Sequence, residues 1–157
     1  MSKTIRTLSI VLFVFGAIAL MMGAVFLYQG VSKNMLLANI MKQENVKLSD
    51  LGVTGSMANE VIDNPQTAQT AGDTVRAHRH SIAPTYKDLL AGGKYDPSNP
   101  KDLTYAQALN LENYLYVGVL SFGVTQIAMA TGGFMVLMAL ALGAIGYMLL
   151  VVSKKLK

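Results

Sequence analysis

The sequence predicts an all-α membrane protein with two long antiparallel transmembrane helices that project beyond the membrane and a small helical extracytoplasmic domain inserted between them. Residues 113–152 contain no Asp, Glu, Lys or Arg, and a second uncharged run covers residues 7–32. A polar segment, residues 33–112, separates the two runs. Because about 20 helical residues cross a bilayer core of about 30 Å, the C-terminal run is about twice as long as one span requires.

Charge divides sharply between the polar middle and the two ends of the chain. Residues 33–112 hold eight Lys or Arg and nine Asp or Glu, a balance of −1. The ends are purely basic and carry Lys3, Arg6, Lys154, Lys155 and Lys157. By the positive-inside rule, this pattern predicts a membrane protein with two spans, both termini cytoplasmic and the middle outside. Since the middle is slightly acidic, nucleic acid is not an expected partner.

Counting inward from the basic tips sets the expected domain boundaries. These are a cytoplasmic tip at 1–6, transmembrane helices at 7–30 and 132–152, an extracytoplasmic domain at 31–131 and a cytoplasmic tail at 153–157. The first apolar stretch exceeds the roughly 7–15 residues of a cleaved signal peptide, so we interpret it as an uncleaved span. A turn at residues 131–133 would give three spans instead, but it would place the basic tail outside the cell.

Small residues recur every seven positions in both uncharged runs. They are Ser9, Gly16, Gly23 and Gly30 in the first run, and Gly118, Thr125, Gly132, Ala139 and Gly146 in the second. A heptad of small residues keeps one seam of a helix against its neighbour and lets the two backbones approach closely.

Pairing residues whose numbers sum to 162 gives one long antiparallel hairpin. The predicted pairs are Gly16 with Gly146, Gly23 with Ala139, Gly30 with Gly132, Leu37 with Thr125 and Glu44 with Gly118. The alternative is that the seam joins neighbouring copies of the chain.

The polar middle has recognisable helix signals. The first helix is expected to continue past Gly30 and to fade near residues 44–46, before a loop at 47–64 with one short extended piece. Asn64-Pro65 predicts a helix start, with Asn as N-cap and a helix to about Ser81. A short helix at 85–90 follows Pro84, and a further helix from about Asn99 or Asp102 is expected to run unbroken into the membrane.

Two histidines, His78 and His80, are the first candidates for chemistry. Two positions apart on a helix, they point about 200° apart and cannot share one ion. His78 continues an apolar stripe with Val75 and Ile82, which predicts a packed side chain, and His80 falls with Arg76 on the polar side. We therefore expect no metal, haem or other cofactor.

Arg76, Arg79, His80 and Lys87 form a local basic cluster. It is a candidate contact for lipid headgroups or an acidic partner. The alternative is a solvated helix face paired with Asp73 and Asp88.

Three oxygen-bearing residues, Asp96, Asn99 and Asp102, raise the possibility of a calcium site. The spacing of a calcium loop is missing, so turn formation and helix capping are the expected roles. Glu112, the last charge before the long uncharged run, is expected to pack within the extracytoplasmic bundle.

The order of features resembles a group of small actinobacterial-type membrane proteins often labelled aromatic ring-opening dioxygenase, for which no activity is established. The resemblance rests on residues 44–46, on the helix from Asn64-Pro65 to Ala77-His78, on residues 85–89 and on residues 122–124. The label implies non-haem iron held by two His and a carboxylate on one face. The two His of this chain cannot provide that arrangement on a helix.

The expected function is that of a non-enzymatic integral membrane protein, either an accessory or assembly subunit of a larger membrane complex or a homo-oligomer. Its expected partners are the lipid bilayer and a protein surface, or a second copy, that covers the uncharged helix at residues 113–131. The alternative is an extracytoplasmic metal- or haem-dependent, dioxygenase-like enzyme that uses His78 or His80.

Overall fold

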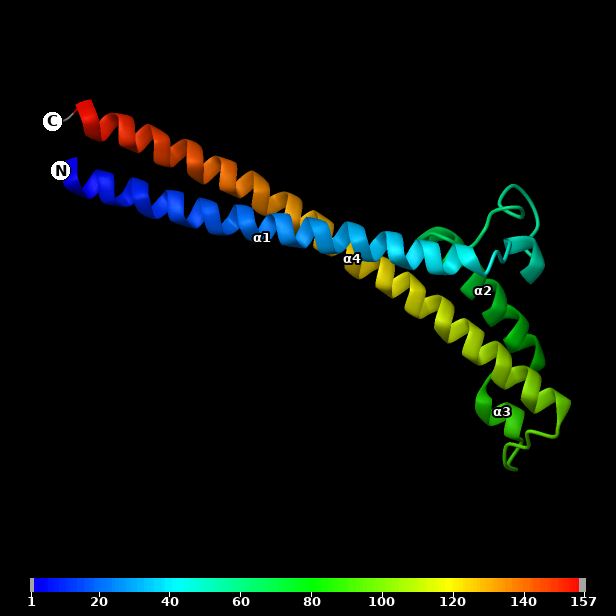
Figure 1. Cartoon of the computed structure of the whole chain (residues 1–157). Coiled ribbons are helices and arrows are strands. Elements are labelled where there is room, and N and C mark those ends of the chain that lie inside the picture. Colours follow the sequence, from blue (N-terminus) through cyan, green and yellow to red (C-terminus); the bar gives the residue numbers. More distant parts are fainter. Residues whose placement is uncertain (1, 156–157) are drawn as a thin grey trace. The chain divides into compact units, whose positions relative to one another are not determined.

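The structure, a computed structural model, describes residues 2–155 and consists of helices joined by loops (Figure 1). The helices are α1 (Ser2–Gln43), the 3₁₀-helix η1 (Leu48–Leu51), α2 (Pro65–Ile82), α3 (Tyr86–Leu90) and α4 (Pro100–Lys155). Within the described residues, extended structure is limited to a single antiparallel bridge between Lys47 and Val61. The all-α prediction is confirmed.

Both long helices are apolar enough to cross a membrane. The most apolar window has a mean hydropathy of 2.8 in α1 and 2.5 in α4, and only 11% of each window is buried within the protein. A core helix of a soluble protein would be mostly covered by its own chain, whereas these helices present their large apolar side chains outward.

Helix α4 passes through residues 131–133 without interruption. The alternative with a turn at this point and three spans is therefore wrong. Gly132 and Gly133 do not break the helix, and the turn-to-turn hydrogen bonds continue through them. Because Gly132 has no side chain, α1 can approach α4 closely at this position, as described below.

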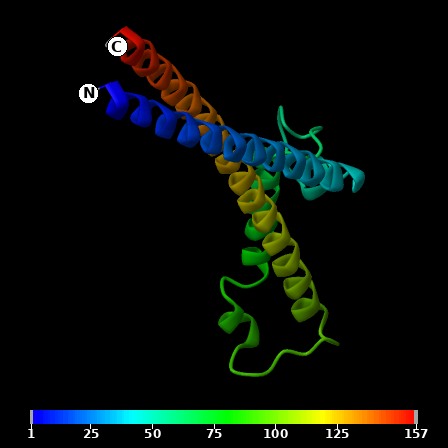
Figure 2. The same ribbon diagram turned by 60° about the vertical axis from the view of Figure 1, so that its left-hand side comes forward.

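The chain divides into two compact units. The first consists of Met1–Asn34 and Val124–Lys157, and the second consists of Met35–Gly123. In the first unit, the corresponding parts of α1 and α4 run antiparallel, with the start of α1 and the end of α4 at the same end of the unit (Figures 1 and 2).

The contact between the helices of the first unit is made by small residues. Every buried residue described there is Gly, Ala, Ser or Thr: Ser9, Gly16, Gly23, Gly30, Thr125, Gly132, Ala139, Gly146 and Ser153. A Cβ atom added at Gly23 would lie 2.9 Å from the Gly132 carbonyl oxygen, so the two backbones touch. Small side chains on the seam allow this approach, and van der Waals packing along it holds the helices together.

The observed register differs from the predicted one by one heptad. Gly16 faces Ala139, Gly23 faces Gly132 and Gly30 faces Thr125, so facing residue numbers sum to 155 rather than 162. The predicted pairs are therefore wrong, including Leu37 with Thr125 and Glu44 with Gly118: Asn34 bonds to Thr125, and in the second unit Met41 lies against Gly118.

A strict heptad cannot distinguish offsets of seven residues, because each offset keeps small residues on the seam. Contacts that occur only once along the seam distinguish the observed register from the predicted one. The Ser9 hydroxyl donates to the Gly146 carbonyl oxygen at 2.6 Å, and the Asn34 amide donates to the Thr125 hydroxyl at 2.9 Å.

Disulfide trapping checks this register directly, because the chain has no cysteine of its own. We expect Gly16→Cys with Ala139→Cys to crosslink within one chain. Gly23→Cys with Ala139→Cys should crosslink poorly, because seven residues displace the partner by about 10.5 Å along the helix, beyond the roughly 7 Å that a disulfide spans between Cα atoms. Gel mobility of the oxidised protein reports the yield, and a reversed order of yields would contradict the observed register.

The second unit has an apolar core between α2, η1, the end of α1 and the start of α4. Its buried side chains are Leu48, Ile62, Ala68, Ala71, Val75 and Leu115. The 3₁₀-helix η1 was not predicted within the loop at 47–64. It inserts Leu48 into this core and is capped at its C-terminal end by Gly52, whose φ of +88° favours glycine. Helix α2 therefore packs through one face onto α4, which positions the polar side chains described next.

Candidate functional site

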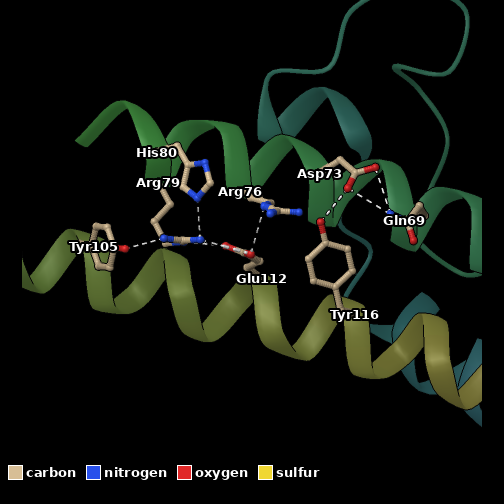
Figure 3. Close-up of polar contacts among 8 residues, drawn as sticks. All are labelled: Gln69, Asp73, Arg76, Arg79, His80, Tyr105, Glu112 and Tyr116. Atoms are coloured by element: carbon tan, nitrogen blue, oxygen red, sulfur yellow. Dashed lines mark hydrogen bonds and ion pairs between the residues drawn. The ribbon is translucent and has the colours of Figure 1, made fainter. Parts of the chain in front are cut away.

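A row of polar contacts joins α2 to α4 in the second unit (Figure 3). The start of α2 is fixed by its N-cap: the Asn64 side-chain oxygen accepts hydrogen bonds from the Gln66 and Thr67 backbone N–H groups, both at 3.0 Å. Pro65 occupies the first helical position, where no backbone donor is needed. This cap sets which residues of α2 face α4.

Arg79 is the central residue of the row. It is buried, and its Nε atom donates to the Glu112 carboxylate at 2.6 Å. Its Nη1 atom donates to the Tyr105 hydroxyl at 2.5 Å, and the guanidinium carbon lies 5.0 Å from the centre of the Tyr105 ring. The hydrogen bond to Glu112 raises the pKa of Arg79 above its ordinary value, against the opposing effect of burial. The result is a buried, fully paired ion pair between two helices.

The prediction that His78 packs inside and Arg79 lies in the basic surface cluster is wrong. His78 is exposed, and Arg79 occupies the inward position one residue later. The inward face of α2 runs through Ala68, Ala71, Val75 and Arg79, at helical spacings of three and four. A charged residue can take this position because Glu112 supplies its counter-charge. Glu112 is buried, as its expected place within the bundle required, but its pairing with Arg79 was not predicted, since 33 residues separate the two.

The remaining basic residues form a smaller surface than predicted. Arg76, His80 and Lys87 are exposed, and Arg76 reaches Glu112 only at 4.0 Å. The His80 Nε2 atom lies 3.0 Å from the Arg79 Nη2 atom. Because a guanidinium only donates, His80 Nε2 is the acceptor in this contact. The expected pairing partner Asp88 instead accepts a hydrogen bond from the Thr85 hydroxyl at 2.7 Å. The Thr85 oxygen in turn accepts from the Asp88 backbone N–H at 3.1 Å, which caps α3.

A second group of polar contacts in the row lies nearer the start of α2. The Tyr116 hydroxyl donates to the Asp73 carboxylate at 2.6 Å, and Gln69 donates to the same carboxylate at 3.1 Å. Gly72 leaves room for the Tyr116 ring, which would lie 3.2 Å from a Cβ atom there. The hydrogen bond from Tyr116 is the main reason why the pKa of Asp73 falls below 3.8 and that of Tyr116 rises above 10.0.

Tyr116→Phe tests this contact through the pH dependence of stability. The lowered pKa of Asp73 means that its ionised form stabilises the fold above about pH 3.8, and that this contribution disappears as the pH falls through the folded-state pKa. We expect the substitution to reduce stability by less than about 1 kcal/mol at pH 6, since the pair is exposed, and by less still at pH 2. NMR titration of the Asp73 carboxyl carbon should show its pKa rising toward 3.8. An unchanged pKa would contradict the assignment.

The candidate calcium residues serve turns and caps, as expected. Asp96 accepts from the Ser98 N–H, Asn99 accepts from the Lys101 N–H, and the buried Asp102 accepts from the Asp96 N–H at 3.0 Å. In the part of the chain that the structure describes, no three His, Asp or Glu side chains lie close enough together to hold a metal ion.

An uncharged surface on α4 is the other candidate site of the second unit. Tyr114, Val117 and Leu120 are 75%, 57% and 69% exposed, and we call these three residues the α4 patch. They follow one another at helical spacing, so they lie on one side of the helix. Large apolar side chains at this exposure, outside a core, are typical of surfaces that contact another molecule.

The polar side chains of the row bind to one another. Arg79 of α2 bonds to Glu112 and Tyr105 of α4, and Asp73 of α2 bonds to Tyr116 of α4. These contacts connect the two helices. Comparison of the chain with family models, with curated proteins and with solved structures yields no match.

Proposed function

We propose that the chain is an integral membrane protein with no enzymatic activity of its own, an accessory or assembly subunit of a larger membrane complex in a bacterial plasma membrane. In this proposal the first unit crosses the bilayer twice with both tips in the cytoplasm. The second unit lies outside, and the partner covers the uncharged part of α4 at residues 113–131, which begins in the second unit and continues into the first.

The composition of the first unit supports the membrane part of the proposal. Its buried residues are all small, while Phe15, Met21 and Phe134 are among the large apolar residues left exposed. This distribution is the reverse of that in a water-soluble helix pair, and it matches helices that pack through small residues and turn their bulk toward lipid. The basic residues at the two tips favour their cytoplasmic placement.

The α4 patch is the observation that carries the partner proposal. It belongs to the second unit, which holds most of the chain's charged side chains and an ion-paired core of its own. If the second unit lies outside the membrane, Tyr114, Val117 and Leu120 are exposed to water unless another protein covers them. Burial of such side chains is worth about 1.5–3 kcal/mol each, enough to hold a specific contact.

Labelling of single cysteines tests the topology. In intact cells, Asn59→Cys in the exposed loop of the second unit should react with a membrane-impermeant maleimide, whereas Lys154→Cys should react only after the membrane is opened. Reaction of both residues in intact cells, or of Lys154→Cys alone, would contradict the proposed orientation.

A photo-crosslinking residue at Leu120 tests the partner. We expect ultraviolet light to give an adduct at this position, and none at Asn59, which is exposed in the same unit but lies outside the patch. An adduct with twice the mass of the chain would assign the patch to a homo-oligomer, and any other mass would identify an accessory role. Equal yields at Leu120 and Asn59, or none at either, would refute the proposed contact.

A further inference from the structure

The core of the second unit opens to the surface at a hollow of about 300 Å³. Its walls are Met41, Val46, Leu51, Ile62, Leu111 and Leu115, and its one polar residue is Glu44. Ligand sites of proteins have this construction: mostly apolar walls with a polar group that orients the ligand, at volumes from about 300 Å³ upward.

Glu44 lies where a negative charge is poorly compensated. It follows directly on Gln43, the last residue of α1, and the C-terminal end of a helix carries partial negative charge. Among the described residues no salt bridge reaches Glu44, and Lys42 of the last turn does not line the hollow. A carboxylate and a helix C-terminus together attract a cation to this edge of the hollow.

A second hollow of about 480 Å³ shares the walls Leu51 and Leu111. Its charged residue is also acidic, Asp50, and the Asp50 carboxylate already accepts from the Lys47 N–H at 2.8 Å. Neither lining contains Lys or Arg, although the chain as a whole has a net charge of +4. The two hollows thus share two apolar walls, and the formally charged residue of each lining is an acid, accompanied in the second by the polar residues His78, Thr104 and Gln107.

We propose that the first hollow binds a small amphiphilic cation, with its apolar body beside Leu115 and its ammonium group at Glu44. Scaling from a cavity of about 150 Å³ that holds one benzene, the body should have roughly ten to twelve non-hydrogen atoms. An anion of the same shape would be repelled by Glu44 and by the partial negative charge at the end of α1. The site is separate from the α4 patch and does not depend on the proposed partner.

Two probes of one shape and opposite charge test the proposal: 4-phenylbutylammonium and 4-phenylbutyrate. The full-length protein is held in an amphipathic polymer, because the alkyl chain of a detergent could enter the hollow. Met41 lines the hollow, and its methyl group provides an NMR signal, assigned from the spectrum of a Met41→Leu variant. We expect a saturable shift of this signal with the ammonium probe, and binding at least about fivefold weaker with the carboxylate probe.

Glu44→Gln should remove the preference between the two probes while leaving binding of the apolar body. The matched control Glu60→Gln changes an exposed carboxylate of the same unit outside both linings and should keep the preference. The proposal is overturned if the Met41 signal shows no saturable shift, if the two probes bind equally, or if both variants behave alike. A Met41 shift that depends on protein concentration without probe would assign the hollow to a second copy of the chain and would also overturn it.

Discussion

Glu112→Gln is expected to destabilise the second unit by about 3–5 kcal/mol. The substitution leaves the Arg79 guanidinium buried, bonded to Tyr105 but without its counter-charge. Removing one member of a buried ion pair has this large effect because the remaining charge keeps its desolvation penalty and loses the compensating attraction. Hydrogen exchange of the backbone amides at residues 66–82 of α2 measures the loss, since Arg79 connects this helix to α4.

The double variant Arg79→Met with Glu112→Leu distinguishes the effect of the unpaired charge from that of side-chain packing. Replacing both charges by apolar groups of similar volume should recover most of the lost protection, since no unpaired charge is left. Glu60→Gln, an exposed carboxylate of the same unit, should change stability by less than about 0.5 kcal/mol. If Glu112→Gln is as mild as Glu60→Gln, the ion pair does not hold the two helices together.

Gly132→Val is expected to disrupt the helix pair of the first unit. A Cβ atom at Gly132 would lie 2.8 Å from both the Gly23 carbonyl oxygen and the Leu27 nitrogen. These are backbone atoms and cannot swing away like the end of a side chain, so the helices must separate or shift. Overpacking of this kind costs about 1–3 kcal/mol, and more where backbone is involved. In the Gly16→Cys, Ala139→Cys background, the disulfide yield should fall at least about tenfold.

The adjacent glycine provides the matched control. In the part of the chain that the structure describes, no atom outside the adjacent residues and the local helix backbone lies within 4 Å of a Cβ placed at Gly133. Gly133→Val makes the same chemical change one position along the same helix and should leave the disulfide yield close to that of the parent. Similar losses for both variants would mean that helix propensity, and not the contact with α1, is responsible.

Much of the fold could be predicted because its signals are local. The Asn64-Pro65 pair places the start of α2 at Pro65, and the apolar repeat beyond Gly30 places the end of α1 near Gln43. The unbroken run from about Asn99 appears as α4. Each of these signals depends on neighbours within a turn or two of helix. The 3₁₀-helix at Leu48–Leu51 was missed because four residues offer no periodic pattern.

The polar row between α2 and α4 could not be predicted, for a different reason. A helical wheel assigns charged residues to the solvent, so Arg79 was placed outside and His78 inside. The pairing of Arg79 with Glu112 depends on how two helices meet, and a single sequence carries no local signal of that contact. A buried acid on one helix and a buried base on another can be predicted only when the two helices are known to meet.

By itself, the sequence determined that the chain is helical, that its uncharged runs are long and apolar enough to cross a membrane, and that small residues repeat along one seam of each. These properties follow from composition and periodicity, which act along the chain. Only the tertiary structure decided the register of that seam, with Gly23 on Gly132, and the burial of Arg79 against Glu112. A periodic seam fits equally well at every heptad, so contacts that occur once, such as Ser9 with Gly146, have to select one.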